Sequence, residues 1–300
     1  MEIIGHKLVQ EFFSRTLEAG RIGHAYVLVG PDHIGKTTLV HSIATRLLDT
    51  TVQKLMSHPD FIVVGQLRDE KTDALKRDIS IDQIIELKSS LSRQAFSGGY
   101  SVALVTGAEK MSTAAANSLL KTLEEPKANT VLFLTTTDDE MLPQTILSRA
   151  QVLYFSRVSE NEIRSALERE YGSVKKIDEI ISDSRGLPGR AIEWLQNGES
   201  YDLYKEEEKR FNSLFGKSFH DKIATIEPLF SDKSDTVTAR ENLISILCLW
   251  ELLLRNRGIM NQGDVYSWVK IEQKIIQAKR LLQKNIHPRL LVEEVLLMIP

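Results

Sequence analysis

The segment from Gly30 to Thr38 combines residue types and a spacing that can hold the phosphates of a nucleotide. It reads Gly-Pro-Asp-His-Ile-Gly-Lys-Thr-Thr. Glycines permit a tight turn in which successive backbone N–H groups face phosphate oxygens, and the helix start adds positive potential. Lys36 would reach the terminal phosphates, and the Thr37 hydroxyl would hold Mg²⁺. A structural glycine turn is the alternative interpretation. The residues predicted to bind nucleotide are Gly30, Pro31, Gly35, Lys36, Thr37 and Thr38.

The carboxylates that a nucleotide hydrolase needs are missing from the position where they are expected. In phosphate-loop hydrolases, acidic residues at the end of a neighbouring strand hold Mg²⁺ and polarise the attacking water. Here the apolar run 102–105 is followed by Thr106 and Gly107. Glu109 comes two residues later, and we interpret it as a surface charge at the start of a helix. We therefore expect nucleotide binding with little or no hydrolysis.

Arg149 is a second candidate for chemistry on a phosphoryl group. It ends a short predicted helix that begins after Pro143. A planar guanidinium at the edge of a domain can reach into the nucleotide of a neighbouring subunit and stabilise charge on the transferring phosphoryl group. The local pattern taken alone favours a surface or structural arginine.

The composition restricts the remaining classes of protein. Of the 300 residues, 42% are hydrophobic and 26% are charged, which is typical of a soluble globular protein. A net charge of −3 argues against bulk electrostatic binding to nucleic acid, although a local basic patch stays open. The start of the chain has no signal pattern, and no segment approaches the ~18 apolar residues that span a bilayer. We expect a cytoplasmic protein with no membrane partner.

The sequence offers no metal cluster and no disulfide. The seven histidines do not cluster, and a single cysteine, Cys248, excludes an internal disulfide and a multi-cysteine zinc site. Cys248 lies in an apolar run, so we expect a buried, inert core thiol.

Five short apolar runs, separated by helical patterns, can position these groups on one sheet. Continuous apolar runs of this length are typical of parallel strands that are buried on both faces. Beyond residue 156 the strand pattern disappears, and only helical patterns follow, with a plausible boundary near Asn197 and Gly198. The fold class is therefore predicted to be α/β, followed by helical parts. The five predicted strands are 25–29, 61–64, 102–105, 131–134 and 152–155.

Several segments, taken together and in order, resemble one family. They are HAYVLVG at 24–30, HPD at 58–60, AAANSLLKTLEEP at 114–126, Ser148-Arg149, and GLPGRA at 186–191. This combination is similar to the delta-prime family of bacterial DNA polymerase III clamp-loader subunits, which are AAA+ proteins. The resemblance covers nearly the whole chain, and the block that ends in Leu-Glu-Glu-Pro is its most specific part.

The resemblance implies a protein of three parts that helps to load the ring-shaped sliding clamp onto primed DNA. The parts would be an AAA+ nucleotide-binding domain at 1–156, a helical lid at 157–199 and a helical collar at 200–300 that joins subunits in a ring. Its partners would be the gamma/tau and delta subunits, with the clamp and DNA reached through the complex. Arg149 would be an arginine finger acting in trans on the ATP of an adjacent gamma/tau subunit. The family's role as a stator without productive hydrolysis agrees with the missing acids at Thr106 and Gly107.

The chain departs from the family pattern at several positions. No cysteine occurs in the interval 48–57, where the family often carries a zinc module, so no zinc is expected. Ala150 replaces the usual cysteine after Ser-Arg, a change between small residues that leaves the finger plausible. The phosphate loop is retained, which leaves binding of ATP or ADP, with or without Mg²⁺, open. Arg190 lies one place after the lid arginine of active relatives, which puts a sensor role for it in doubt.

Two other classes stay open on the sequence. A hydrolysing AAA+ ATPase of the gamma/tau type, or another AAA+ motor, would need acids at Thr106 and Gly107. A small-molecule phosphate-loop kinase would leave the long helical tail without a role.

Overall fold

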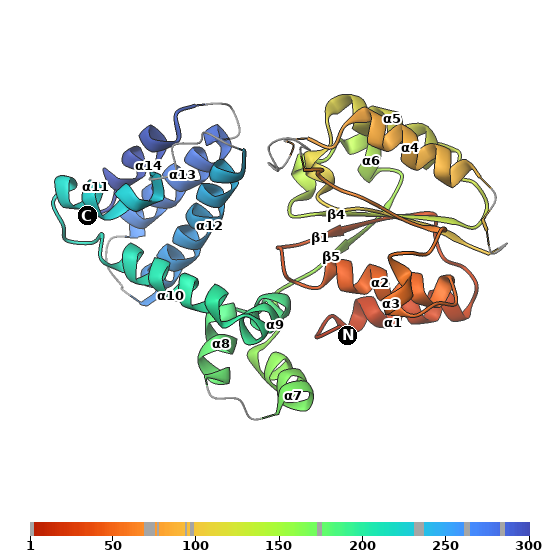
Figure 1. Cartoon of the computed structure of the whole chain (residues 1–300), viewed down its shortest axis with the longest axis horizontal. Helices are drawn as coiled ribbons and strands as arrows, with labels where there is room; N and C mark the ends of the chain where they lie inside the picture. The colour runs from red at the N-terminus through yellow and green to blue at the C-terminus, as the bar shows by residue number, and fades with distance from the viewer. Residues whose placement is uncertain are drawn as a thin grey trace. The chain divides into compact units, whose positions relative to one another are not determined.

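A computed structural model of the chain (Figure 1) contains two compact units, which are considered separately. The first comprises Met1–Arg68 and Lys76–Asn197, and the second includes Gly198–Pro300. The finer division of the chain into three parts stays a prediction. The structure describes residues 3–68, 76, 78–93, 95–96, 99–172, 176–230, 237–260, 265–282 and 286–300.

The first unit is built on a five-stranded sheet with the order β2-β3-β4-β1-β5, in which every strand pair is parallel. Strand β1 pairs with β4 on one side and β5 on the other, so that Val29 is level with both Thr136 and Tyr154. The predicted parallel sheet is therefore confirmed, with all five apolar runs as its strands. The strands are β1 (Ala25–Val29), β2 (Phe61–Val64), β3 (Ser101–Val105), β4 (Thr130–Thr136) and β5 (Gln151–Tyr154).

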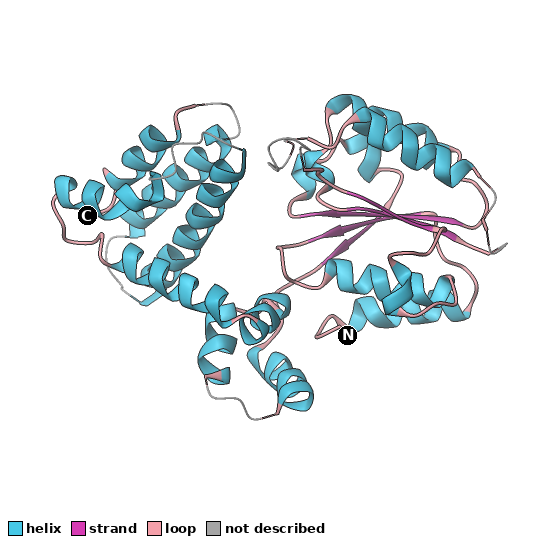
Figure 2. Cartoon of the chain, in the orientation of Figure 1, coloured by secondary structure: helices cyan, strands magenta, loops and turns pink. Residues whose placement is uncertain are grey.

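Helices cover both faces of this sheet (Figure 2). Helices α4 (Ile81–Ser92), α5 (Thr113–Glu124) and α6 (Gln144–Leu147) lie on one face. Helices α1 (Lys7–Glu18), α2 (Lys36–Leu47) and α3 (Val52–Leu55) lie on the other. Strands β1, β3 and β4 are buried along their whole length, whereas the outer strands β2 and β5 are partly exposed. Burial on both faces explains why the three inner strands are continuous apolar runs.

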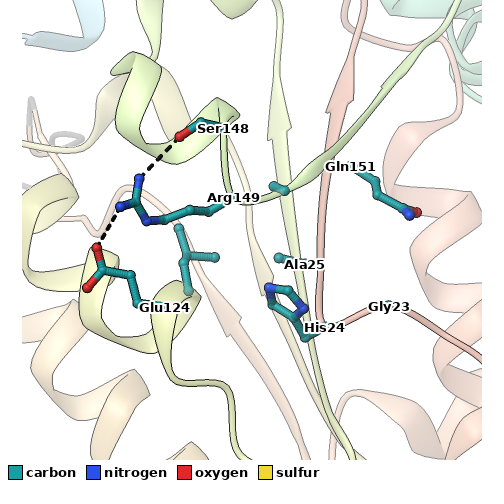
Figure 3. A pocket seen from close by; sticks show the side chains of 9 residues that line it. Gly23, His24, Ala25, Glu124, Ser148, Arg149 and Gln151 are labelled. Atoms are coloured by element: carbon teal, nitrogen blue, oxygen red, sulfur yellow. Dashed lines mark hydrogen bonds and ion pairs between the residues drawn. The ribbon is translucent and has the colours of Figure 1, made fainter.

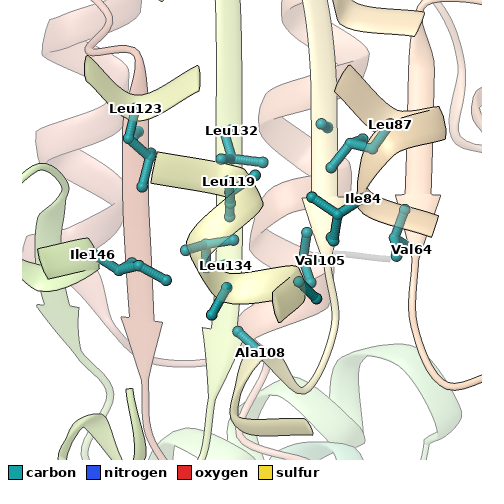
Figure 4. Packing of buried hydrophobic residues seen from close by; sticks show 14 of the residues in the cluster. Val64, Ile84, Leu87, Val105, Ala108, Leu119, Leu123, Leu132, Leu134 and Ile146 are labelled. Atoms are coloured by element: carbon teal, nitrogen blue, oxygen red, sulfur yellow. The ribbon is translucent and has the colours of Figure 1, made fainter. Parts of the chain in front are cut away.

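The core between the sheet and helices α4 and α5 is made of aliphatic side chains at helical spacing (Figure 4). Ile84 and Leu87 of α4 and Leu119 of α5 point at Val105, Leu132 and Leu134 of the sheet. Both helices begin at a serine cap. Ser80 accepts a hydrogen bond from the backbone of Gln83 in a full capping box, as its sequence predicts, and Ser112 accepts one from Ala115. These caps fix where each helix starts and thereby which residues face the sheet.

The other face of the sheet carries an aromatic cluster that also shapes the loop before β1. Tyr26 stacks on Phe133 with ring centroids 5.4 Å apart, and Phe13 of α1 meets Tyr26 edge-on at 4.9 Å. The Tyr26 hydroxyl accepts a hydrogen bond from the Gly23 backbone at 2.7 Å. The cluster therefore holds α1 on the sheet and fixes the start of β1.

Three helices complete the first unit: α7 (Glu160–Tyr171), α8 (Ile177–Ser184) and α9 (Pro188–Gln196). Gly186, before α9, approaches the segment after β5 closely: a Cβ there would lie 2.7 Å from the Val158 carbonyl oxygen. Val158 and Gly186 also join through a backbone hydrogen bond of 2.9 Å. These contacts anchor the start of α9.

From Gly198 onward, every regular element that the structure describes in the second unit is a helix. A buried carboxylate lies in its core: Glu207 accepts a hydrogen bond from the Trp250 indole at 2.8 Å and pairs with Arg210. Burial raises the pKa of Glu207, and these two partners oppose that shift. The helices are α10 (Gly198–Asn212), α11 (Phe219–Ile226), α12 (Val237–Met260), α13 (Val265–Leu282) and α14 (Pro288–Leu296).

Cys248 is exposed on α12, so the expectation of a buried thiol is wrong. The apolar run around it is longer than one helical face. Leu247 and Trp250, three positions apart, lie on the buried face of the helix, and Cys248 lies outside that face. Its sulfur lies 3.6 Å from the Lys279 ammonium.

Truncation of Leu119 tests the packing of α5 on the sheet. Leu119 is fully buried, so Leu119→Ala should lower the free energy of unfolding by about 2–5 kcal/mol through lost contacts and a cavity. Urea unfolding followed by circular dichroism measures this change. The exposed Asn117→Ala on the same helix should stay within about 0.5 kcal/mol of the parent. Equal effects of the two substitutions would contradict the assigned orientation of α5.

Candidate nucleotide site and interface arginine

The loop between β1 and α2 has a backbone that requires glycine at two positions. Gly30 has φ of 156°, and a Cβ there would lie 2.7 Å from the Phe155 carbonyl oxygen. Gly35 has φ of 109° and immediately precedes α2. His33 also adopts a left-handed conformation, with φ of 61°. The loop thus turns sharply and ends at the amino end of α2, the strand-loop-helix arrangement that the spacing predicts.

Lys36 is the first residue of α2, and its side chain is buried inside the turn. Its ammonium donates hydrogen bonds to the carbonyl oxygens of Gly30 and Pro31, the latter at 2.9 Å. The Asp32 carboxylate lies 3.9 Å from Nζ. Burial lowers the pKa of Lys36, while Asp32 and Glu109 raise it. A partly desolvated ammonium held by neutral carbonyls is arranged to accept a stronger anionic partner, such as a phosphate.

A pocket of about 410 Å³ surrounds this loop. Of the six predicted nucleotide-binding residues, five line it, whereas Gly30 lies at the base of the loop. The N-terminal Ile3 and Ile4 close one side, and Pro188, Gly189 and Ile192 of α9 close another. Sequence reasoning missed these five residues. Ile3, Ile4 and Ile192 belong to no motif. Pro188 and Gly189 belong to the GLPGRA segment, but they reach the loop only through tertiary packing.

Thr106 and Gly107, the positions where acids were sought, do line this pocket. The Thr106 hydroxyl donates to the Val64 carbonyl at 3.3 Å, and the Gly107 backbone donates to the Thr135 hydroxyl at 3.3 Å. Neither residue carries a carboxylate. The end of β3 therefore reaches the pocket as expected, and the wall of the pocket carries no carboxylate at these two positions.

Glu109 lies at the start of a helix, as interpreted, but it is only partly a surface charge. The helix is the short 3₁₀ helix Ala108–Lys110, after Gly107 with φ of 63°. The left-handed glycine turns the chain back, so that Glu109 is half-buried and its charge acts on Lys36. The Thr137 hydroxyl lies 3.5 Å from Oε1, while Oε2 is buried without a hydrogen-bond partner among the described residues.

Helix α9 packs directly on the phosphate loop through Gly189. The Gly189 backbone N–H donates to the His33 carbonyl oxygen at 2.8 Å, and a Cβ at this position would lie 2.8 Å from the same oxygen. One turn later, Glu193 lies 3.5 Å from His33 Nδ1. Arg190, whose sensor role was in doubt, places its guanidinium 5.9 Å from the ring centre of Trp194. The loop and α9 therefore cannot move independently.

Arg149 lies in a different place, at the amino-terminal end of the strands (Figure 3). Its guanidinium donates from NH1 to the Thr145 carbonyl at 3.0 Å and the Ser148 hydroxyl at 3.1 Å. NH2 pairs with Glu124 at 2.8 Å. Arg149, Ser148 and Glu124 border an open pocket of about 730 Å³. Its other lining residues are Gly23, His24, Ala25, Leu123, Ala150 and Gln151.

The structure does not bring Arg149 to the phosphate loop of the same chain. Arg149 precedes β5 and shares its pocket with the start of β1, whereas the loop follows the end of β1. The five residues of β1 separate the two sites by roughly 16 Å along the strand. The sheet therefore carries two separate candidate sites at opposite ends of its strands.

The part of the chain that the structure describes contains no group of three or more His, Cys, Asp or Glu residues that could hold a metal ion. No helix in that part is long and apolar enough to cross a bilayer.

The parallel sheet, the glycine loop after β1 and the helices that pack on that loop define a phosphate-loop protein of the AAA+ class. Its family follows from comparison with known proteins. The profile of the family described as DNA polymerase III, delta subunit, matches residues 5–159, and the chain belongs to this family.

Individual relatives match a larger part of the chain than the family profile does. DNA polymerase III subunit delta′ of Haemophilus influenzae is 28% identical over 300 residues, which cover 90% of this chain and 86% of the relative. The delta′ subunit of Escherichia coli is 31% identical over 196 residues, which cover 60% and 57%. A solved structure, a DNA polymerase III gamma subunit-related protein of Thermotoga maritima, covers 96% of this chain and 97% of its own. Its TM-score of 0.56 at 17% identity supports the fold alone.

Gly189→Ala tests the contact between α9 and the phosphate loop. The added Cβ collides with the His33 carbonyl, so α9 must shift, at a cost of about 1–3 kcal/mol in stability. Because α9 also walls the pocket, we expect weaker binding of a fluorescent ATP analogue. Gly198→Ala is the control, since a Cβ there meets open space. Parent-like affinity and stability of Gly189→Ala would contradict this contact.

Three partly desolvated histidines in or near the loop and α2 predict a loss of stability in mild acid. Burial is the main cause that lowers the pKa of His6, which contacts the Ile34 carbonyl at 3.1 Å, and of His33 and His41. The unfolded chain, with the ordinary value of 6.5, then binds protons more readily than the folded chain. The free energy of unfolding should therefore fall as the pH drops below about 6.5. Urea unfolding at several pH values measures it, and His6→Gln should flatten the dependence. Identical pH curves for parent and variant would contradict the effect of burial.

Proposed function

We propose that this chain acts as a delta-prime-type stator of the DNA polymerase III clamp loader. In this proposal it binds a nucleotide in its phosphate loop with little or no hydrolysis. It supplies Arg149 in trans to the nucleotide of an adjacent gamma/tau subunit, and it thereby helps to load the sliding clamp onto primed DNA. Family membership and the relatives named delta′ support the type of subunit.

The single observation that carries the role of Arg149 is its distance from its own loop. An arginine at the opposite end of β1 has no access to the nucleotide of its own chain. It lies at an open pocket, with 36% of its side chain exposed, where a neighbouring molecule can reach it. A guanidinium presented in this way suits the stabilisation of charge on a phosphoryl group held by another subunit.

The lack of productive hydrolysis rests on the wall of the nucleotide pocket. Thr106 and Gly107 occupy the positions from which carboxylates would bind Mg²⁺ and orient the attacking water. A threonine hydroxyl already bonded to a backbone carbonyl cannot act as a general base at neutral pH. Binding does not need those acids, because the backbone of the loop and Lys36 provide the contacts to phosphate.

The cofactor in this proposal is ATP or ADP. The residues that would hold its phosphates are the backbone of 31–37 and the Lys36 ammonium. The Thr37 hydroxyl would be the protein ligand of Mg²⁺, whose remaining ligands would be phosphate oxygens and water. Bound Mg²⁺ would neutralise phosphate charge. No zinc belongs to the proposal, because the interval 48–57 has no cysteine.

The partners are proposed from the same family membership. The gamma/tau and delta subunits would be direct neighbours in a hetero-oligomer, and the clamp and primed DNA would be reached through the complex. The proposed location is the cytoplasm, where these partners act, and membranes have no role. The helical second unit, residues 200–300 in the predicted division, would join the subunits.

One observation favours a second candidate, a hydrolysing AAA+ ATPase of the gamma/tau type. The Glu109 carboxylate acts on Lys36 and keeps one buried oxygen without a hydrogen bond among the described residues. A carboxylate in that state could serve a metal ion or a water. Against it, Glu109 does not belong to the lining of the nucleotide pocket.

ATP turnover separates the two candidates. The chain alone should fall well below the ordinary enzyme rate of about 1 per second. Mixed with gamma/tau, delta, clamp and primed DNA from the same organism, the complex should hydrolyse ATP. Arg149→Ala should slow that complex by about a thousandfold or more, because the finger stabilises the transition state.

Arg15→Ala, which removes an exposed arginine on α1, is the matched control and should leave turnover unchanged. Unchanged turnover of an assembled Arg149→Ala complex would refute the role in trans. Turnover by the isolated chain that Lys36→Ala abolishes would establish the second candidate instead.

A further inference from the structure

We propose that Glu124 is the positioning residue for Arg149, and that it fixes the direction in which the guanidinium is presented to a neighbouring subunit. This inference rests on the proposed function of Arg149. Glu124 is the last residue of α5, and its Oε1 lies 2.8 Å from NH2 of Arg149 (Figure 3).

Three acceptors on two different elements restrain the guanidinium. NH1 is held by the Thr145 carbonyl within α6 and by the Ser148 hydroxyl just after it, and NH2 pairs with Glu124 at the end of α5. The contacts to Thr145 and Ser148 are local in sequence. Among the described residues, Glu124 is the partner that comes from a distant, long helix packed on the sheet, and it therefore adds a restraint on the orientation of the guanidinium that the local contacts do not supply.

The remaining donors are suited to a phosphate. A guanidinium has five N–H donors. NH1 uses two donors in its hydrogen bonds to the Thr145 carbonyl and the Ser148 hydroxyl, and NH2 forms the ion pair with Glu124. Nε makes no hydrogen bond among the described residues, so donors remain for a phosphate that enters the open pocket.

Stability does not explain why an acid occupies this position. A negative charge in the last turn of a helix meets the negative end of the helix dipole, which is unfavourable. The ion pair is half-exposed, with 49% of the Glu124 side chain accessible, and pairs of this kind contribute little to folding. The neighbouring Glu125 has no such partner among the described residues. The orientation of Arg149 is therefore the effect that explains why a carboxylate stands at position 124.

The experiment is a double-mutant cycle in the reconstituted complex, with DNA-stimulated ATP hydrolysis as the readout. Glu124→Gln keeps the shape of the side chain but removes its charge. Because misplacement of a catalytic group by about 1 Å can cost a hundredfold, we expect kcat to fall by roughly 10- to 100-fold with KM for ATP unchanged. In an Arg149→Ala background, Glu124→Gln should cause no further loss.

Glu125→Gln, on the adjacent exposed residue, is the matched control and should leave kcat unchanged. Thermal unfolding and gel filtration verify that each variant folds and assembles. Unchanged kcat for Glu124→Gln, with Arg149→Ala still inactive, would overturn the role of Glu124 alone. A rise in kcat would also overturn it, since Glu124 would then restrain the finger in an unproductive position.

An equal loss in both backgrounds would show that Glu124 acts independently of Arg149, and would overturn the inference as well. Full activity of Arg149→Ala would refute the proposed function together with this inference. The cycle therefore distinguishes failure of the positioning role from failure of the finger.

Discussion

The backbone pairing of β1 between β4 and β5 is the constraint on which both candidate sites depend. All five residues of β1 are buried, and their hydrogen bonds to two neighbours leave the strand no freedom to slide. At its carboxyl end, this pairing brings Gly30 against the Phe155 carbonyl and so sets the turn of the phosphate loop. At its amino end, the backbone of His24 bonds to Leu132 and forms the border of the pocket with Arg149. A shift of one residue in β1 would disrupt the loop and that border together.

The strands, a helix cap and the phosphate loop of the first unit could be predicted from residues that are close in sequence. The strands are continuous apolar runs because the inner three are buried on both faces, and the capping box of Ser80 and Gln83 follows from two residue types at a fixed spacing. The phosphate loop was predictable for the same reason, since Gly30 and Gly35 are required by the backbone itself. Each of these features depends on residues that are close in sequence.

The features that sequence reasoning missed depend on contacts between distant segments. Gly189 belongs to the GLPGRA segment, but nothing in that segment shows that it rests on the carbonyl of His33. The partial burial of Glu109 was missed because the turn at Gly107, rather than the period of a strand or helix, sets its direction. Cys248 was misjudged because a helix that is apolar over most of its circumference does not reveal which stripe is buried. The place of Arg149 at one end of the sheet is likewise set by tertiary structure, and its proposed role came from the resemblance rather than from the short helical pattern around it.

The placement of the phosphate loop and Arg149 at opposite ends of β1 has a consequence for symmetry. A surface that offers an arginine and a surface that receives one are different, so contacts through them are heterologous rather than two-fold. Such contacts give a row of subunits a polarity, with an order that cannot be reversed. In the proposed assembly, a member that offers its arginine but carries no acids at the end of β3 is suited to a terminal place in that row. The residue types at Thr106 and Gly107 would then bear on position within an assembly as well as on hydrolysis.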